Sequence, residues 1–162
     1  MKKTIFSIVI AALVAVVMTS CGKKNEIPAG IKINQEVYSV MVPETWSYDV
    51  TGSGKYQYVN LTKAMPGASG KISFHAYANT SDTPDALMQK MCRTRNGWQY
   101  QEKKELGDNT WSVAYAPNTH TKFAPRYSLF SALKRGVLYV QLEDIDINNE
   151  EAQQILSSVE MK

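Results

Sequence analysis

The chain has 162 residues, which is enough for one domain with a substantial hydrophobic core. Its formal charge is +3, and apart from Lys2 and Lys3 it contains sixteen basic and fifteen acidic side chains. This balance gives no overall positive charge of the kind that a nucleic-acid-binding protein carries. It also argues against a strongly anionic partner.

Residues 1–20 have the pattern of a secretory signal peptide. Two lysines precede an apolar run from Ile5 to Met18, and a charged start, a short apolar run and a small-residue end are typical of such signals. The run is shorter than the ~20 residues that a helix needs to cross a bilayer. We therefore expect export of the chain and removal of this segment.

The end of the signal, Met18-Thr19-Ser20-Cys21, resembles the lipobox of bacterial lipoproteins. The resemblance implies that the Cys21 thiol carries a lipid and that the protein is anchored in the bacterial cell envelope, at the outer membrane. Residues 21–30 are polar and contain Pro28, which predicts a flexible lipidated tether. Lys23-Lys24-Asn25-Glu26 is similar to the charged segment that follows the cysteine in Bacteroidetes lipoproteins. The alternative is an ordinary signal peptide with a chance cysteine.

Residues 31–162 are expected to form a single domain that begins with strands. The segment from Val37 to Val42 combines alternation with β-branched residues and ends at Pro43, which predicts a strand. A polar link and a Gly52-Ser53-Gly54 turn are expected after it.

Two further strands are predicted from strict alternation. In Tyr56–Leu61 the tyrosines occupy one face while valine and leucine occupy the other, and Ile72–Tyr77 alternates in the same way. The proline and glycines between them predict a loop over Met65–Gly70.

A helix is predicted after Thr83, which can cap it, with Pro84 at the first helical position. Leu87, Met88, Met91 and Cys92 then share one face, and Gly97 is expected to end the helix. If Cys21 is acylated, Cys92 has no disulfide partner. A lone thiol in an oxidising compartment is safest buried, and we expect Cys92 in the core.

The remaining elements are two hairpins and a final helix. The first hairpin joins residues 98–104 and 110–115, and the second joins residues 127–133 and 137–142 across Lys134-Arg135-Gly136. Asn148 or Asn149 is expected to cap the final helix, with Glu151 completing a capping box from Asn148. The apolar stripe of that helix consists of Ala152, Ile155, Leu156 and Val159.

Seven strands joined mainly by turns, together with two amphipathic helices, predict an α+β fold. We expect a largely antiparallel seven-stranded sheet packed with the two helices as an α/β/α sandwich. Over about residues 36–160, the strand leading into Val42-Pro43-x-x-Trp46 and the final Glu150–Val159 segment resemble the PsbP-like and DcrB-like domains. The resemblance implies an accessory or assembly role rather than an enzymatic one.

The inventory of chemically active residues is small. His75 and His120 are far apart, and the sequence has no paired spacing that would fix a metal. A nucleophile elbow and a phosphate-binding loop are also missing. Oxygen side chains crowd residues 144–151, but capping explains two of them and the glycine of an EF-hand loop is missing. We therefore predict no catalytic residue, no metal and no cofactor.

Aromatic residues offer a different kind of site. On strands they can form a platform for a sugar or a peptide, but they also fill cores, and the core explanation is the simpler one. The residues concerned are Tyr56, Tyr58, Tyr77, Trp98, Tyr100, Trp111 and Tyr115.

The loop from Ala116 to Arg126 is about twice the length that a hairpin connection normally needs. Binding residues concentrate in long loops on rigid sheets, so His120, Lys122 and Phe123 form a candidate binding site. The alternative is that Phe123 packs into the core and the rest is an ordinary solvated connection.

Together these features predict a lipid-anchored, non-catalytic binding or accessory protein of the bacterial envelope, with the membrane and an envelope protein as partners. The alternatives are a small envelope hydrolase whose site is not visible in the sequence, and a structural subunit of an outer-membrane complex. A histidine pair beside a carboxylate would indicate the hydrolase. A continuous exposed aromatic or apolar patch would indicate binding.

Overall fold

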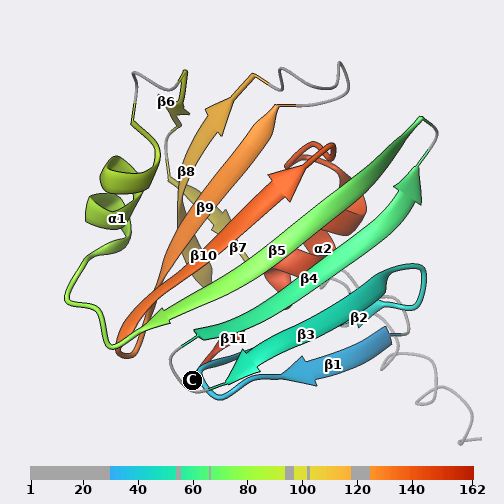
Figure 1. Ribbon diagram of the computed structural model, residues 1–162, viewed down its shortest axis with the longest axis horizontal. Helices are drawn as coiled ribbons and strands as arrows, with labels where there is room; N and C mark the ends of the chain where they lie inside the picture. Colours follow the sequence, from blue (N-terminus) through green and yellow to red (C-terminus); the bar gives the residue numbers. More distant parts are fainter. Residues whose placement is uncertain (1–29, 54–55, 66, 94–96, 102, 118–124) are drawn as a thin grey trace, which may run out of the picture.

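The computed structural model describes residues 30–162 except 54–55, 66, 94–96, 102 and 118–124 (Figure 1). The predicted signal peptide, Cys21 and nearly all of the tether lie outside the described residues. The described part is mostly antiparallel β-structure with two short helices. Neither helix is long and apolar enough to cross a membrane.

The main sheet has eight strands in the order β3-β4-β5-β10-β9-β8-β6, and β7 pairs with β8 beside β6. Every pairing in it is antiparallel. The strands are β3 (Ser47–Ser53), β4 (Tyr56–Met65), β5 (Ala68–Ala78), β6 (Gln99–Tyr100), β7 (Lys104–Leu106), β8 (Asn109–Ala116), β9 (Arg126–Leu133) and β10 (Gly136–Glu143).

A second sheet has three antiparallel strands in the order β1-β2-β11. They are β1 (Gly30–Asn34), β2 (Tyr38–Pro43) and β11 (Glu160–Met161). The Lys32 ammonium lies 2.6 Å from the Glu160 carboxylate and links the first and last strands. The expectation of seven strands in one sheet is therefore wrong, because the described residues form eleven strands in two sheets.

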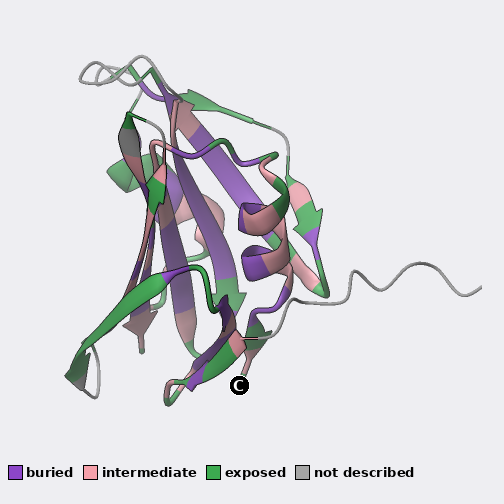
Figure 2. Ribbon diagram, turned by 90° about the vertical axis from the view of Figure 1, so that its right-hand side faces the viewer, coloured by how far each residue is buried: buried purple, intermediate pink, exposed green. Residues whose placement is uncertain are grey.

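The two helices cover opposite sides of the main sheet, because alternate residues of β10 belong to two different core clusters. Leu138, Val140 and Leu142 pack with α2 (Glu150–Ser157) and the small sheet. Val137 and Tyr139 pack in the cluster of α1 (Pro84–Met91). Figure 2, turned by 90°, shows the strands between the two helices.

Helix α1 begins as predicted, since the Thr83 side chain accepts a hydrogen bond from the backbone N–H of Ala86 at 3.2 Å. It ends at Met91, before Gly97, so the predicted end is wrong, and Met91 on the predicted apolar face is 36 % exposed. Cys92 is buried as predicted. Burial raises the pKa of its thiol, which keeps the thiol protonated and unreactive.

Helix α2 packs as predicted, with Ile155 and Leu156 fully buried. Its cap is Asn149, whose side chain accepts from the backbone N–H groups of Glu151 and Ala152. The predicted capping box from Asn148 is wrong, because the Glu151 carboxylate is hydrogen-bonded to Trp46 and Lys63 instead.

The Glu151 carboxylate joins two distant parts of the chain. It accepts hydrogen bonds from the Trp46 indole N–H at 3.1 Å and from the Lys63 ammonium at 2.7 Å. The Lys63 hydrogen bond is the main cause of the lowered pKa of Glu151. The Val-Pro-x-x-Trp segment and the start of the last helix are therefore in direct contact.

Candidate functional site

The candidate site lies on the half of the main sheet that α1 leaves open. Helix α1 packs against β8, β9 and β10. In Figure 1 no described element lies in front of β3, β4 and β5, while α2 lies behind β4 and β5. On this open side β4, β5 and β10 carry a group of rings that we name the tyrosine face: Tyr56, Tyr58, His75, Tyr77 and Tyr139.

The strand register brings these rings together, because directly paired residues of antiparallel strands point to the same side. Tyr58 pairs with His75, and His75 pairs with Tyr139 across the next strand. The ring centroids of the first pair are 4.9 Å apart and those of the second are 5.4 Å apart. Tyr77 pairs with Tyr56, and its ring lies 6.5 Å from that of Tyr139. All these separations are in the range of favourable aromatic contacts.

Exposure increases from the centre of the sheet towards its edge. Tyr139 is 8 % exposed and Tyr56 is 58 % exposed, while Tyr58, His75 and Tyr77 between them are half-buried. The inner rings hold the outer ones in position, and the outer ones present accessible ring faces.

The tyrosine face is uncharged at neutral pH. Burial lowers the pKa of His75, which favours the neutral imidazole. Burial also raises the pKa of Tyr139 to about 12 and raises that of Tyr77, so both phenols remain protonated. The rings therefore offer stacking surfaces and neutral hydrogen-bonding groups.

A row of polar side chains flanks the rings. Asn60 pairs with Ser73, and Ser73 pairs with Gln141, so all three point to the open side and all are half-buried. The Tyr139 hydroxyl donates to the Gln141 side-chain oxygen at 3.1 Å, which fixes the amide beside the ring. Hydroxyl and amide groups are thus placed along one border of the aromatic surface.

The aromatic residues singled out from the sequence do not form one platform. Only three of them, all tyrosines, lie on the tyrosine face. Trp111 is fully buried in the core of the α2 side, Tyr115 packs against that core, and Trp98 is buried with α1. Tyr100 is 43 % exposed, and its hydroxyl donates to the Cys92 carbonyl oxygen.

Sequence reasoning missed Tyr139 and Gln141 as site residues. The signal was available in the alternation of β10, where both occupy the side opposite to Leu138 and Val140. Which open surface that side faces depends on the pairing of β10 with β5, and no local pattern reveals this pairing.

His75 does not lie in a catalytic arrangement with described residues. Its ring contacts are with the aromatic side chains of Tyr58 and Tyr139. The described residues also contain no group of three or more side chains that could hold a metal ion. The predicted loop site of His120, Lys122 and Phe123 lies outside the described residues, so it stays a prediction, as does lipidation of Cys21.

A polar pocket of about 430 Å³ lies at the start of α1. Its Asp85 carboxylate accepts a hydrogen bond from the Ser112 hydroxyl at 2.5 Å and lies 3.2 Å from the Lys103 ammonium. The Ser112 hydrogen bond is the largest cause of the lowered pKa of Asp85. These contacts hold the helix against β8 and leave the carboxylate already partnered.

No family model matches the sequence, and no curated protein is significantly similar to it.

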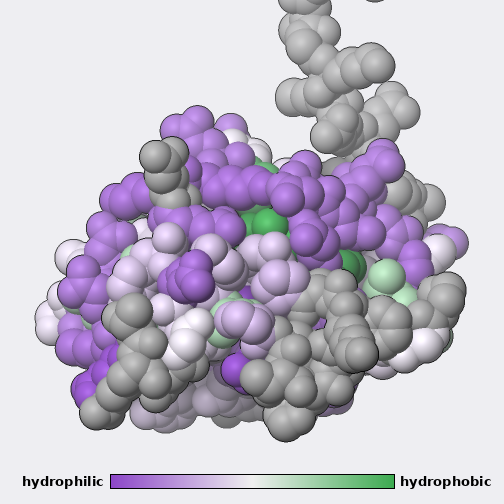
Figure 3. Space-filling model, turned by 90° about the horizontal axis from the view of Figure 1, so that it is seen from above, coloured by the Kyte–Doolittle hydropathy of each residue, from purple (hydrophilic) through white to green (hydrophobic). Residues whose placement is uncertain are grey.

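Seen from above, the described surface is mostly hydrophilic, and hydrophobic residues appear only as small separate areas (Figure 3). This end of the molecule offers no broad apolar patch among its described residues. The tyrosine face, by contrast, is a surface of rings in mutual contact.

Proposed function

We propose that this chain is a lipid-anchored, non-catalytic binding protein of the bacterial cell envelope, attached at the outer membrane. The lipobox-like Met18–Cys21 and the polar tether after it support the anchor. A tethered domain is also supported by the start of β1 at Gly30, the last residue of the expected tether. Its role is to hold a ligand or an envelope partner at the membrane.

The tyrosine face carries the binding part of the proposal. The His75 and Tyr139 rings are neutral, and Asn60, Ser73 and Gln141 border them, with the Gln141 amide N–H donating to the Glu143 carboxylate at 3.0 Å. A neutral polyhydroxylated ligand suits such a surface, because its rings stack on aromatic faces while its hydroxyl groups pair with amides. We therefore assign a segment of neutral glycan as the ligand.

We also propose that the domain is related to the PsbP-like and DcrB-like folds. The hydrogen bond between Trp46 and Glu151 supports this, since it connects the two sequence segments that carry the resemblance. These residues stabilise the fold, and no binding role is transferred to them.

Replacing Cys21 with Ser is expected to abolish lipidation and release a soluble domain, because the thiol is the atom to which the lipid is attached. Detergent partitioning and mass spectrometry of the mature N-terminus measure this. The unchanged protein serves as the lipidated control. A Cys21→Ser variant that still partitions with detergent would refute the anchor.

Replacing Tyr56 and Tyr58 with Ala is expected to weaken glycan binding about tenfold or more. Each aromatic contact contributes about 0.5–1.5 kcal/mol, and a loss of 1.4 kcal/mol corresponds to about tenfold in affinity. Affinity electrophoresis of the domain in gels containing neutral polysaccharides measures the effect.

The matched control is Tyr48→Ala. Tyr48 is also on the main sheet and is 47 % exposed, but it pairs with the core residue Leu61 and so faces the other side. This variant is expected to bind like the unchanged protein. The glycan assignment fails if no neutral polysaccharide retards the unchanged domain, or if the Tyr56/Tyr58 variant is retarded equally.

A further inference from the structure

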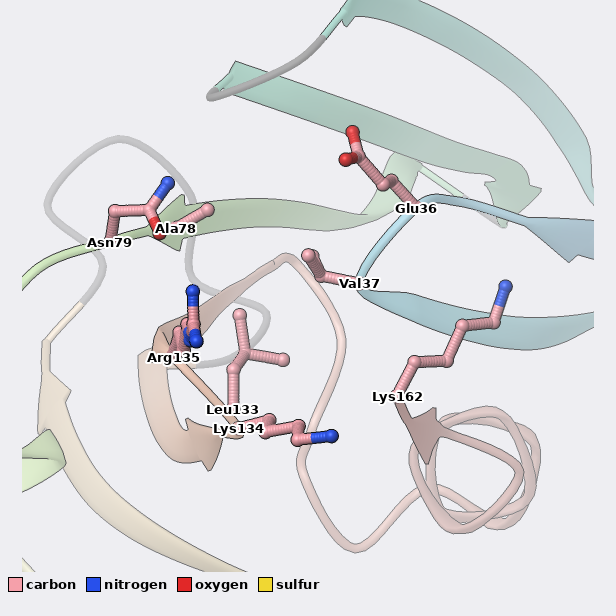
Figure 4. A pocket seen from close by; sticks show the side chains of 8 residues that line it. All are labelled: Glu36, Val37, Ala78, Asn79, Leu133, Lys134, Arg135 and Lys162. Carbon is pink, nitrogen blue, oxygen red and sulfur yellow. The ribbon is translucent and has the colours of Figure 1, made fainter.

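A pocket of about 380 Å³ lies where four segments meet: the β1–β2 turn, the end of β5, the β9–β10 turn and the residue after β11. This volume is in the range of small-molecule binding sites. Figure 4 shows the side chains of Val37, Ala78 and Leu133 around its apolar part. The pocket is separate from the tyrosine face, because Leu133 belongs to the core cluster on the other side of the main sheet.

Three cationic side chains line this pocket: Lys134, Arg135 and Lys162. None of them forms an ion pair with a described carboxylate. Lys134 and Arg135 are neighbours in the chain, so their charges repel each other without a described counter-ion. The nearly balanced total charge of the chain gives no indication of this local excess of positive charge.

The cations are held by a rigid frame. Leu133 pairs with Gly136, which places Lys134 and Arg135 in a two-residue hairpin turn. The backbone N–H of Asn79 donates to the Arg135 carbonyl oxygen at 2.8 Å and fixes the turn to the end of β5. A site that is already ordered loses little conformational entropy when a ligand binds.

Lys162 is oriented in the same way. Its ammonium donates to the Gln35 carbonyl oxygen at 2.6 Å, and its backbone N–H donates to the Val37 carbonyl oxygen at 3.0 Å. An ammonium has three donors, so this contact leaves two for a ligand.

Glu36 is the one acidic side chain among the described residues that line the pocket. Gln57 holds it at both ends: its amide N–H donates to the carboxylate at 3.0 Å and its oxygen accepts from the Glu36 backbone N–H at 2.9 Å. Three cationic side chains and one acidic side chain therefore line the pocket, so its lining has an excess of positive charge.

We propose that this pocket binds a small soluble phosphate monoester with an apolar body. Arginine offers a planar fork and lysine a point charge for phosphate oxygens, while the apolar side chains take up the rest of the ligand. A phosphodiester lipid headgroup also presents phosphate oxygens beside an apolar body. The β1–β2 turn, which lines the pocket, and the tether lie at opposite ends of β1, five residues or about 16 Å apart. This separation of the pocket from the anchor favours the soluble source.

The test is a calorimetric titration of the lipid-free domain with phenyl phosphate. The variant Lys134→Gln/Arg135→Gln is expected to bind at least tenfold more weakly than the unchanged domain. Both side chains are exposed in a turn, so the fold is expected to persist. Glu36→Gln is expected to bind several-fold more tightly, because the amide can still pair with Gln57 but no longer repels the anion.

The matched control is Lys71→Gln/Arg93→Gln, which removes two exposed positive charges away from the pocket. It is expected to bind like the unchanged domain. An equal loss in this control, or no loss in the Lys134/Arg135 variant, would overturn the proposal. A second outcome would also overturn it: no binding of phenyl phosphate, together with binding to phosphatidylcholine vesicles that contain phosphatidylglycerol but not to vesicles of phosphatidylcholine alone. That result would assign the pocket to a lipid headgroup.

Discussion

Replacing Ile155 with Asp is expected to destabilise the domain by roughly 3–5 kcal/mol, because an unpaired charge would be buried in a closed core. Ile155 is 0 % exposed and lies on α2, in the cluster that joins the helix to both sheets. Domains of this size have a stability of about 5–15 kcal/mol. The loss is therefore a large part of the total, and urea denaturation followed by circular dichroism measures it.

Gln153→Asp is the matched control on the same helix. Gln153 is half-buried and lies outside the core cluster, so a carboxylate there can reach water and is expected to cost well under half as much. A denaturation midpoint for Ile155→Asp close to that of the unchanged protein would mean that α2 does not pack on the sheets in solution.

The sequence alone predicts those strands and helices in which the apolar residues of the pattern are the ones buried in the structure. The alternation of Ile72, Phe74 and Ala76 marks the buried side of β5, and Ile155 and Leu156 mark the buried side of α2. In both segments the apolar period equals the period of the structure, so periodicity is sufficient.

The strands that were missed lack this agreement. β3 has the sequence SYDVTGS and is an edge strand, and residues 47–52 are all exposed, so neither of its faces is buried. β11 has two residues and exists only because β2 lies beside it. The predicted Met65–Gly70 loop is mostly strand, since β4 runs to Met65 and β5 begins at Ala68.

The candidate sites depend even more on long-range pairing. Alternation places Tyr58 and His75 on the non-core sides of their strands, but only the β4–β5–β10 register makes them one surface with Tyr139. The pocket lined by Lys134, Arg135 and Lys162 is formed by residues from Glu36 to Lys162. No spacing along the chain indicates that these residues meet. Local sequence therefore identifies which side chains are available, while the sheet order determines which of them act together.

The glycine that closes the β9–β10 hairpin gives the second large expected effect. Gly136 has φ +131°, a conformation that side chains rarely adopt. A Cβ there would lie 2.1 Å from the Tyr77 carbonyl oxygen and 3.1 Å from the Ala78 Cα. Both neighbours are backbone atoms of β5, which pairs with β10 at this point, so they cannot move without disturbing the ladder.

Gly136→Ala is therefore expected to lower the stability by more than the backbone strain alone, which is about 1–3 kcal/mol. Gly97→Ala separates the two contributions, because Gly97 also has a positive φ, +80°, but a Cβ there would meet no atom within 4 Å. Urea denaturation of both variants is expected to show a clearly larger loss for Gly136→Ala. Because Gly136 directly follows Lys134 and Arg135 in the turn, Gly136→Ala is also expected to weaken phenyl phosphate binding. Gly97→Ala is expected to leave this binding unchanged. Equal losses of stability in the two variants would mean that the hairpin end separates from β5 in solution, and the rigid frame inferred for the basic pocket would fail with it.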